Sequence, residues 1–277
     1  MTPGRGTHAV VTLAAIDLRR RPDHRAELTS QLLMGEVVHV LASRDGGAWL
    51  RVRNEADGYA GWARAYGLRR ASRARTRRWR TVANARVVAP FAHVTAAKDG
   101  GPTLSPLFWN GRLVAHRGSG PARRVELPDG RQGWAPAAAI DTRDRHVPLA
   151  ERVRGLLGTP YLWGGRTPHG FDCSGLVQQL LAEQSVAVPR DAHEQWLATR
   201  CDLAVPELQF GDLVFFRHRG SRMDHVGLAL GDGWFVHSSG MVRVNSLQSN
   251  NPLCDKWLLD HVRGFGRTKL SGGTRPK

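Results

Sequence analysis

Cys173 is the residue of this chain whose type and position best suit chemistry. It follows Asp172 in LWGGRTPHGFDCS (162–174), and the next ten residues, GLVQQLLAEQ, repeat apolar side chains at the helical period. A proline and a glycine keep the preceding segment out of a helix, so we expect Asp172 to be an N-cap and Cys173 to begin the helix. The unpaired N–H groups of a helix start favour thiolate over thiol. We therefore expect an ionised, nucleophilic Cys173.

A purely structural Cys173 is the alternative, because a free cysteine is often a small buried side chain. Its neighbours are Asp172 and Ser174 rather than apolar residues, which argues against a core position. We expect the sulfur at the mouth of a groove. A catalytic cysteine also needs a histidine within hydrogen-bond reach.

Two histidines lie in DHVGLALGDGWFVHSSG (224–240), which is typical of a β-hairpin around a Gly-Asp-Gly turn. Side chains alternate between faces along a strand, so the turn decides whether His225 and His237 meet. A two-residue loop that pairs Gly231 with Trp234 would place them on opposite faces.

We predict the longer turn, a three-residue loop of residues 231–233 whose last glycine is left-handed. Leu230 would then pair with Trp234, and the second histidine would face Gly227. The first histidine would become its diagonal neighbour on the same face.

Cys173, His225 and His237 would then form a triad of nucleophile, base and orienting group. The chain contains 12 histidines, so each of the two taken alone could equally be structural. The helix before them and the shared face together favour the catalytic interpretation.

Four motifs make the segment from about residue 148 to 267 resemble the NlpC family of bacterial cell-wall cysteine peptidases. They are YLWGG (161–165), FDCSGLVQ (171–178), FGDLVFF (210–216) and DHVG (224–227). The resemblance implies a papain-like α+β domain with Cys173 as nucleophile, His225 as base and His237 as the third polar member. It also implies hydrolysis of the bond between γ-D-glutamate and a diamino acid, diaminopimelate or lysine, in peptidoglycan stem peptides.

The resemblance implies substrate-binding roles for further residues. Tyr161 matches a tyrosine beside the nucleophile and would help the Cys173 N–H stabilise an oxyanion; a packed aromatic is the alternative. Asp191 matches an acidic residue that binds the free amine of the first substrate residue, L-alanine, as in murein recycling. Ala192 departs from the family serine, which puts one substrate hydrogen bond in doubt. Ser174 matches another substrate-contacting serine, or serves only the helix start.

The N-terminal half contains an internal repeat. VRNEADGYAGWA (52–63) and VELPDGRQGWA (125–135) both end in Asp-Gly-x-x-Gly-Trp-Ala, and short alternating segments precede each. We predict an α+β peptidase domain preceded by two small all-β SH3-like barrels. The expected parts are barrel 1 (1–70), a basic linker (71–80), barrel 2 (81–144), the peptidase domain (145–268) and a tail (269–277).

Tyr59 lies in the first copy of the repeat, where the second copy has Arg131. In the peptidases that this chain resembles, the first barrel narrows the active site, so Tyr59 would wall off the amino-terminal end of the substrate. A structural role within its own barrel is the alternative.

The formal net charge of +16 predicts attraction to polyanions. Much of this charge lies in RRASRARTRRWR (69–80), so an anionic wall polymer is one expected partner, and a solvated linker is the alternative. No helix-turn-helix, zinc-ligand or base-stacking motif supports nucleic acid. Three scattered cysteines and the lack of a His-Glu-x-x-His motif predict no disulfide framework, metal or other cofactor.

No apolar stretch is long enough to span a bilayer, and none resembles a secretory leader, which favours a cytoplasmic enzyme; secretion to the wall is the alternative. Two other functions stay open. One is a non-catalytic wall-binding protein, and the other is a related thiol amidase or acyltransferase acting on another amide or on a lipid.

Overall fold

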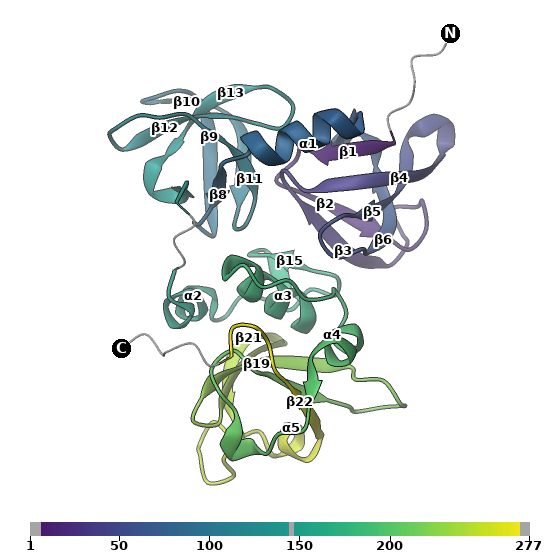
Figure 1. The fold of residues 1–277 in the computed structure, drawn as a ribbon, viewed down its shortest axis with the longest axis vertical. Helices are drawn as coiled ribbons and strands as arrows, with labels where there is room; N and C mark the ends of the chain where they lie inside the picture. Colours follow the sequence, from purple (N-terminus) through teal and green to yellow (C-terminus); the bar gives the residue numbers. More distant parts are fainter. Residues whose placement is uncertain (1–6, 144–146, 272–277) are drawn as a thin grey trace. The chain divides into compact units, whose positions relative to one another are not determined.

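The computed structural model of the chain describes residues 7–143 and 147–271 (Figure 1). They fall into two compact units that divide near residue 145. Most of the expected tail (269–277) lies outside the described residues. Among the described residues, no helix has the length and apolar content that crossing a membrane requires.

The N-terminal unit contains two antiparallel sheets with the same topology. The first consists of β1 (His8–Val11), β2 (Ala15–Arg19), β3 (Leu28–Leu33), β4 (Val37–Arg44), β5 (Trp49–Asn54), β6 (Ala60–Arg64) and β7 (Leu68–Ala71). The second consists of β8 (Ala85–Val87), β9 (Phe91–Ala97), β10 (Gly100–Phe108), β11 (Arg112–Ala115), β12 (Ala122–Glu126), β13 (Gln132–Pro136) and β14 (Ile140–Asp141). Their orders are β3-β2-β6-β5-β4-β1-β7 and β10-β9-β13-β12-β11-β8-β14, which match strand for strand. Among the described residues, the outer strands of each sheet, β3 and β7 in the first and β10 and β14 in the second, do not pair with each other. Neither sheet is therefore closed into a barrel by backbone hydrogen bonds.

The repeated motif forms the same turn in both sheets, between β5 and β6 and between β12 and β13. Asp57 Oδ1 accepts a hydrogen bond from the Tyr59 N–H (3.0 Å), and Asp129 Oδ1 accepts one from the Arg131 N–H (3.0 Å). The glycine after each aspartate has a left-handed backbone, which glycine adopts at no steric cost. The sequence repeat therefore encodes a backbone conformation.

Most of the predicted basic linker (71–80) is helical, because Arg73–Val82 are the helix α1. Ser72 caps it by accepting the Arg75 N–H, and Trp79 donates its Nε1–H to the Gly35 carbonyl (2.8 Å). Arginine is a good helix former. The many arginines make the helical pattern hard to recognise, because the inward face of α1 is short and its buried residue is Thr76. Three short 3₁₀ helices, η1 (Asp45–Gly47), η2 (Ala65–Gly67) and η3 (Ala137–Ala139), complete the unit.

The C-terminal unit combines helices with a six-stranded antiparallel sheet. Its helices are α2 (Leu149–Leu156), α3 (Cys173–Glu183), α4 (Ala192–Thr199), α5 (Lys256–Asp260) and the 3₁₀ helix η4 (Val205–Glu207). Its sheet has the order β17-β22-β18-β19-β20-β21, with β17 (Arg200–Cys201), β18 (Leu213–Phe216), β19 (His225–Gly231), β20 (Trp234–Ser239), β21 (Met241–Ser246) and β22 (Val262–Gly266). A two-residue pair, β15 (Arg166–Thr167) and β16 (Gly170–Phe171), precedes α3. Helix α3 packs against β19 and β20, which brings Cys173 to the histidine hairpin.

The hairpin of β19 and β20 does not have the predicted three-residue loop. Gly231 pairs with Trp234, so the loop is the two residues Asp232 and Gly233. Both have left-handed backbones, with φ of +50° and +75°, as a type I′ turn requires.

A β-bulge nevertheless gives the register that the histidines need. Leu230 is the extra residue on its strand, so Leu228 pairs with Val236. One step further along the same register, His237 comes opposite Gly227. The prediction that the two histidines share a face is therefore confirmed, although the turn that was expected to cause it is wrong.

Candidate active site

Cys173 occupies the predicted place at the start of α3. Asp172 is the N-cap, and its carboxylate accepts the Gly175 N–H at 2.6 Å. Cys173 is only 6% exposed, and its neighbours Asp172 and Ser174 are buried as well, so the inference from these polar neighbours against a buried position is wrong.

The thiol of Cys173 is protonated in this environment. Burial, and then the charge of Asp172, raise its pKa to about 12, while the N–H groups of Val226 and Ser174 lower it by less. Desolvation thus opposes the thiolate that the helix start was expected to favour, and the capping carboxylate opposes it as well. A base must remove the proton during the reaction. The N–H of Val226 also places the sulfur beside the residue that follows His225.

Three side chains form a hydrogen-bonded chain on the sheet next to the sulfur. His225 Nε2 lies 2.8 Å from His237 Nδ1, and His237 Nε2 lies 2.8 Å from Asn245 Oδ1. The amide of Asn245 is fixed because its Nδ2 donates to the Leu253 carbonyl at 2.7 Å.

This chain determines the tautomer of each imidazole. Asn245 Oδ1 can only accept, so His237 Nε2 carries the hydrogen and His237 Nδ1 is an acceptor. His225 must then donate from Nε2, which leaves the lone pair of His225 Nδ1 free. A neutral imidazole with a free lone pair is a general base ready to accept the thiol proton.

The pKa directions agree with neutral rings. Burial, and then the neighbouring His237, lower the pKa of His225 well below its usual value. Burial also lowers the pKa of His237 to about 4, although its bond to Asn245 opposes the shift. Both imidazoles are therefore uncharged at neutral pH.

Asn245 is a member of the site that the sequence analysis missed. His237 pairs with Arg243 across β20 and β21, and Asn245 lies two residues further along the same face. The tight Ser-Ser-Gly-Met connection and strand alternation were the signals that could have indicated it.

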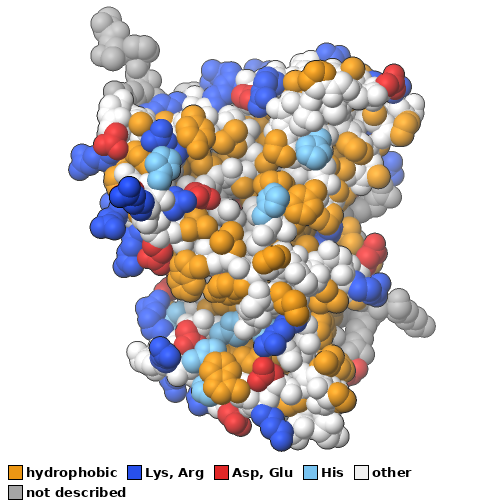
Figure 2. Space-filling model, turned by 180° about the vertical axis from the view of Figure 1, so that it is seen from behind, with side chains coloured by type: hydrophobic (Ala, Val, Ile, Leu, Met, Phe, Trp, Pro, Cys, Tyr) orange, Lys and Arg blue, Asp and Glu red, His pale blue; other side chains and the backbone are white. Residues whose placement is uncertain are grey.

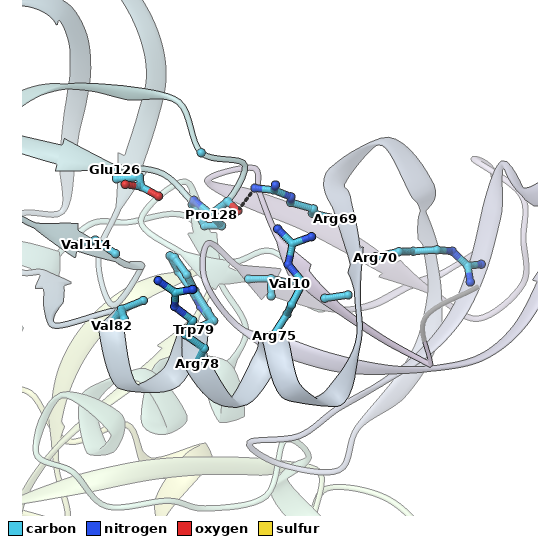
Figure 3. Close-up of a pocket in the computed structure, with 12 residues that line it drawn as sticks. Val10, Arg69, Arg70, Arg75, Arg78, Trp79, Val82, Val114, Glu126 and Pro128 are labelled. Carbon is cyan, nitrogen blue, oxygen red and sulfur yellow. Dashed lines mark hydrogen bonds between the residues drawn. The ribbon is translucent and has the colours of Figure 1, made fainter. Parts of the chain in front are cut away.

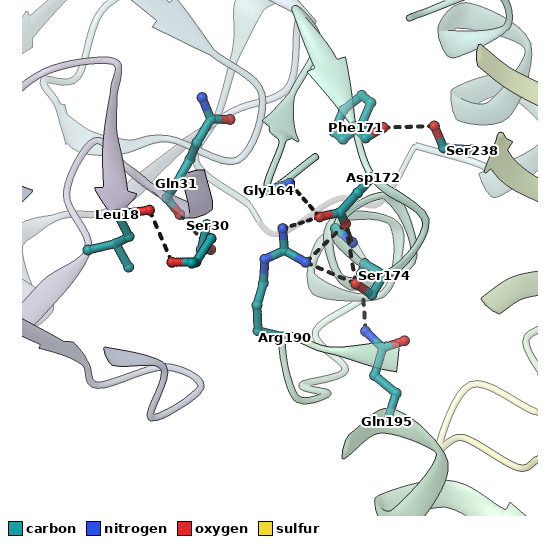
Figure 4. Close-up of polar contacts among 12 residues, drawn as sticks. Leu18, Ser30, Gln31, Gly164, Phe171, Asp172, Ser174, Arg190, Gln195 and Ser238 are labelled. Atoms are coloured by element: carbon teal, nitrogen blue, oxygen red, sulfur yellow. Dashed lines mark hydrogen bonds and ion pairs between the residues drawn. The ribbon is translucent and has the colours of Figure 1, made fainter. Parts of the chain in front are cut away.

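Asp172 is also the centre of a buried polar network (Figure 4). Its two carboxylate oxygens accept from Arg190 at 2.6 and 3.0 Å, and one accepts the Gly164 N–H at 2.9 Å. Arg190 also donates to the Ser174 hydroxyl at 2.9 Å, and Gln195 donates to the Ser174 carbonyl at 3.1 Å.

In this network, charge-assisted hydrogen bonds from Arg190, which is only 2% exposed, hold the turn that carries Cys173. Removal of one partner would leave a buried charge uncompensated, which typically costs about 3–5 kcal/mol. Arg190 was missed as well, since nothing in its local sequence indicates that its guanidinium is buried. Ser174 is engaged by Arg190 and Asp172, which suits the helix-start alternative for its hydroxyl.

The surroundings of Tyr161 and Asp191 raise the pKa of both side chains. Burial, and then the charges of Cys173 and Asp172, raise the pKa of Tyr161, so its phenol remains a hydrogen-bond donor beside the sulfur. Asp191 is the half-buried N-cap residue of α4, but its side chain makes no capping hydrogen bond there. Burial raises its pKa, while Arg190 opposes the shift. A carboxylate in this state gains from an incoming cation.

Tyr59 belongs to the N-terminal unit, where its ring packs against the core of the first sheet. This packing favours the structural alternative for Tyr59. Within the described residues of the same unit, His8, His39 and Glu55 offer ligand atoms that lie within 4.8 Å of one another. Arg80 forms an ion pair with Glu55, so a cation would have to displace this guanidinium before it could bind.

Comparisons with known proteins match a segment of each unit. The NlpC/P60 family model matches residues 158–263, and the bacterial dipeptidyl-peptidase SH3 domain model matches residues 18–68. The chain thus contains an NlpC/P60 cysteine-peptidase domain preceded by a bacterial dipeptidyl-peptidase SH3 domain. The expected α+β fold with an SH3-like N-terminal domain is confirmed.

The chain is similar in sequence to several named bacterial proteins, over different shares of their length. It is 28% identical over 276 residues to "Dipeptidyl-peptidase 6" of Lysinibacillus sphaericus, covering 94% of this chain and 98% of that one. It is 34% identical over 143 residues to the "Gamma-D-glutamyl-L-lysine dipeptidyl-peptidase" of Bacillus cereus, covering 47% of this chain and 42% of the relative. It is 40% identical over 115 residues to the "Bifunctional muramidase/DL-endopeptidase CwlT" of Bacillus subtilis, but spans only 33% of that protein.

Solved structures share the fold. An NlpC/P60 family protein from Bacillus cereus superposes with a TM-score of 0.78 at 21% identity, covering 94% of this chain and 99% of the other. An NlpC/P60 endopeptidase from Photobacterium damselae gives a TM-score of 0.68 at 13% identity, covering 94% of this chain and 70% of the other. At these identities the likeness concerns the fold alone.

Asn245→Ala should lower kcat about tenfold and leave KM nearly unchanged, because His237 would lose the acceptor that fixes its tautomer; the whole acid–base contribution is about two to four orders of magnitude. Asn245→Asp should shift the acid limb of the rate profile to higher pH, since a carboxylate raises the pKa of both imidazoles. Steady-state kinetics across pH would measure both effects. A purely structural Asn245 would change expression or stability without moving the pH profile.

The free energy of unfolding should fall as pH drops below about 6.5. An unfolded histidine titrates near 6.5 and native His237 near 4, so between these values the unfolded chain binds more protons. Stability is thus present above 6.5 and is lost toward pH 4, with about 3 kcal/mol from His237 and a further loss from His225. Urea denaturation at several pH values should show a flatter dependence for His237→Gln than for the native chain. Parallel curves would contradict the assignment.

Proposed function

We propose that this protein hydrolyses the bond between γ-D-glutamate and a diamino acid in peptidoglycan stem peptides. The observation that carries the proposal is the free lone pair on His225 Nδ1, fixed by His237 and Asn245 beside a nucleophile-bearing helix start. The names of the dipeptidyl-peptidase relatives supply the substrate class.

The proposed reaction is acyl transfer through Cys173. The thiol proton passes to His225 Nδ1 as the sulfur attacks the side-chain carbonyl carbon of D-glutamate. His225 then protonates the departing amine of the diamino acid, and the carbon–nitrogen bond breaks. Water, deprotonated by the same imidazole, releases the acyl group and restores the thiol.

The developing oxyanion has two donors in this proposal. One is the N–H of Cys173 at the start of α3, and the other is the phenol of Tyr161, whose raised pKa keeps it protonated. A single well-placed oxyanion donor is typically worth about 10²–10³ in kcat.

Asp191 is the proposed recognition point for the free amine of an N-terminal L-alanine. Its half-buried carboxylate makes no capping bond, and a bound ammonium would relieve the burial that raises its pKa. In the intact wall this amine is joined to the glycan, so a free amine marks a released peptide. We therefore place the enzyme in murein recycling in the cytoplasm, with action at the cell wall as the alternative.

Mass spectrometry of products from L-Ala-γ-D-Glu-L-Lys, with and without N-acetylation, would test substrate and recognition together. We expect release of lysine from the free peptide, a loss of about 10²-fold or more when the amine is blocked, and no turnover by Cys173→Ser or His225→Ala. Asp191→Asn should lose the preference for the free amine. Cleavage of the blocked peptide at the same rate would overturn the recycling proposal but not the peptidase.

The same assay separates the alternative functions. A non-catalytic wall-binding protein would release no lysine yet would still bind the peptide. A thiol amidase or acyltransferase on a lipid or other amide would ignore the γ-D-glutamyl bond and would not depend on Asp191.

We propose an anionic wall polymer as a second partner, bound at a groove of the N-terminal unit. The groove has a volume of about 510 Å³ and is lined by β7, α1 and the second sheet. Figure 3 shows Arg75 and Arg78 on α1 beside Arg69 on β7. Among the residues that the structure describes, the side chains of Arg75 and Arg78 have no ion-pair partner.

The composition of α1 supports a role in binding. Arg73 and Arg75 lie in its first turn, where positive charge opposes the helix dipole. Arg73 and Arg77 repel each other at a spacing of four residues. Each effect costs a few tenths of a kcal/mol, and the fold itself gains nothing from it.

Binding of poly(glycerol phosphate) at several salt concentrations would test this partner. Arg75→Ala/Arg78→Ala should weaken binding about tenfold and reduce the slope of log K against log salt by roughly two, because two phosphate contacts are lost. The matched control is Arg20→Ala/Arg21→Ala, which removes the same charge elsewhere on the unit and should bind normally. Equal losses in both variants would indicate attraction by net charge alone, and tighter binding of single-stranded DNA would favour nucleic acid instead.

A further inference from the structure

The rings of His218, Trp257 and His261 form a cluster next to the catalytic base, and none of them has a role in the proposed reaction. The His218 ring stacks on Trp257 with centroids 4.4 Å apart and an interplanar angle of 12°. His261 lies 5.2 Å from His218 and 4.5 Å from Trp257. Figure 2 shows histidine and hydrophobic side chains gathered on the surface of the C-terminal unit.

Polar contacts hold this cluster in place. The Asp224 carboxylate lies 2.9 Å from His218 Nδ1 and also accepts the backbone N–H groups of His218 and Arg219. His261 Nδ1 lies 2.6 Å from the Trp257 carbonyl. One face of the indole is thus covered, yet Trp257 remains 57% exposed. A large apolar ring that is fixed but exposed suits a binding surface better than a core.

The cluster lies beside His225, where the leaving group of the proposed reaction must bind. The His218 ring lies 6.1 Å from His225, and the other rings in contact with His225, Phe216 and His237, are fully buried. His225 protonates the departing amine in the proposed mechanism, so the leaving group must lie against this imidazole. Among the described rings in contact with His225, His218 is therefore the accessible one, and it joins the base to the rest of the cluster.

The chemistry of the cluster selects a class of leaving group. An open indole face attracts an alkyl chain and, more strongly, an ammonium group. Burial lowers the pKa of His218, although Asp224 opposes the shift, so this imidazole adds no repelling charge at neutral pH. Asp224 is about one-third exposed and contributes negative charge nearby.

We propose that Trp257, supported by His218 and His261, is the subsite for the leaving diamino acid and binds its alkyl chain and terminal ammonium group. This inference rests on the proposed function and adds to it the residues that distinguish a diamino acid from an ordinary amino acid. Trp257 is a specificity residue here, because it contacts the part of the substrate that departs.

The test compares kcat/KM for L-Ala-γ-D-Glu peptides that end in L-lysine, norleucine or L-alanine, using the full chain. The native protein should prefer lysine, and Trp257→Ala should lower the lysine-to-alanine ratio about tenfold, since a partly exposed cation–π contact is worth about 1–2 kcal/mol. Norleucine separates the contribution of the alkyl chain from that of the ammonium group. Trp257→Phe should keep most of the preference.

Leu197→Ala is the matched control, because Leu197 is an exposed apolar residue of the same unit at 46% exposure and lies on α4. It should keep the native ratio. An unchanged ratio in Trp257→Ala, or an equal loss for all three leaving groups, would overturn the subsite. If the native chain cleaves none of the peptides, the peptidase proposal fails instead. Calorimetric binding of the lysine and alanine peptides to Cys173→Ala, with and without Trp257→Ala, would then decide the subsite.

Discussion

The direction of one side-chain amide determines whether this site has a base. Asn245 is held by the Leu253 carbonyl, so its oxygen faces His237, and this fixes the hydrogen positions on both imidazoles. The lone pair of His225 Nδ1 is available at neutral pH because the other nitrogens of the two imidazoles, and the oxygen of Asn245, are already engaged in hydrogen bonds with one another. A flipped amide would present a donor to His237, reverse both tautomers and place a hydrogen where the thiol proton has to go.

Burial makes this arrangement necessary. The sulfur and both imidazoles are almost inaccessible to solvent, which raises the pKa of Cys173 and lowers those of the histidines. A separated thiolate and imidazolium would be costly in such surroundings, so the resting site is a neutral pair, and charge develops only when the substrate arrives. A charged group buried beside this neutral pair, such as the Asp172 carboxylate, needs hydrogen bonds or an opposite charge to compensate it. Asp172 meets this requirement through Arg190 and three N–H or O–H donors.

The sequence was sufficient where the information is local. The apolar period after Cys173 and the capping residue located the helix, and strand alternation showed that the turn of the hairpin decides whether His225 and His237 share a face. It was insufficient where tertiary packing decides. The bulge at Leu230 is a single inserted residue with no compositional mark, yet without it a two-residue turn would have separated the histidines. The thiol pKa depends on depth of burial, and the role of Arg190 depends on a contact 18 residues away, so neither is written in a local pattern.

The N-terminal repeat shows which parts of a duplicated sequence are constrained. In both copies the aspartate accepts an N–H two residues later and the next glycine is left-handed, so these positions cannot vary without changing the turn. The second glycine of the motif is fixed by close approach: a Cβ on Gly61 would lie 3.0 Å from Leu18, and one on Gly133 would lie 2.5 Å from the Thr95 carbonyl. The residue between these constraints is free to differ. Tyr59 packs into its own sheet, whereas Arg131 bonds to the Leu104 carbonyl and to its own turn. The two copies of the motif therefore share the backbone of the turn and differ in the contacts of the side chain between the constrained positions.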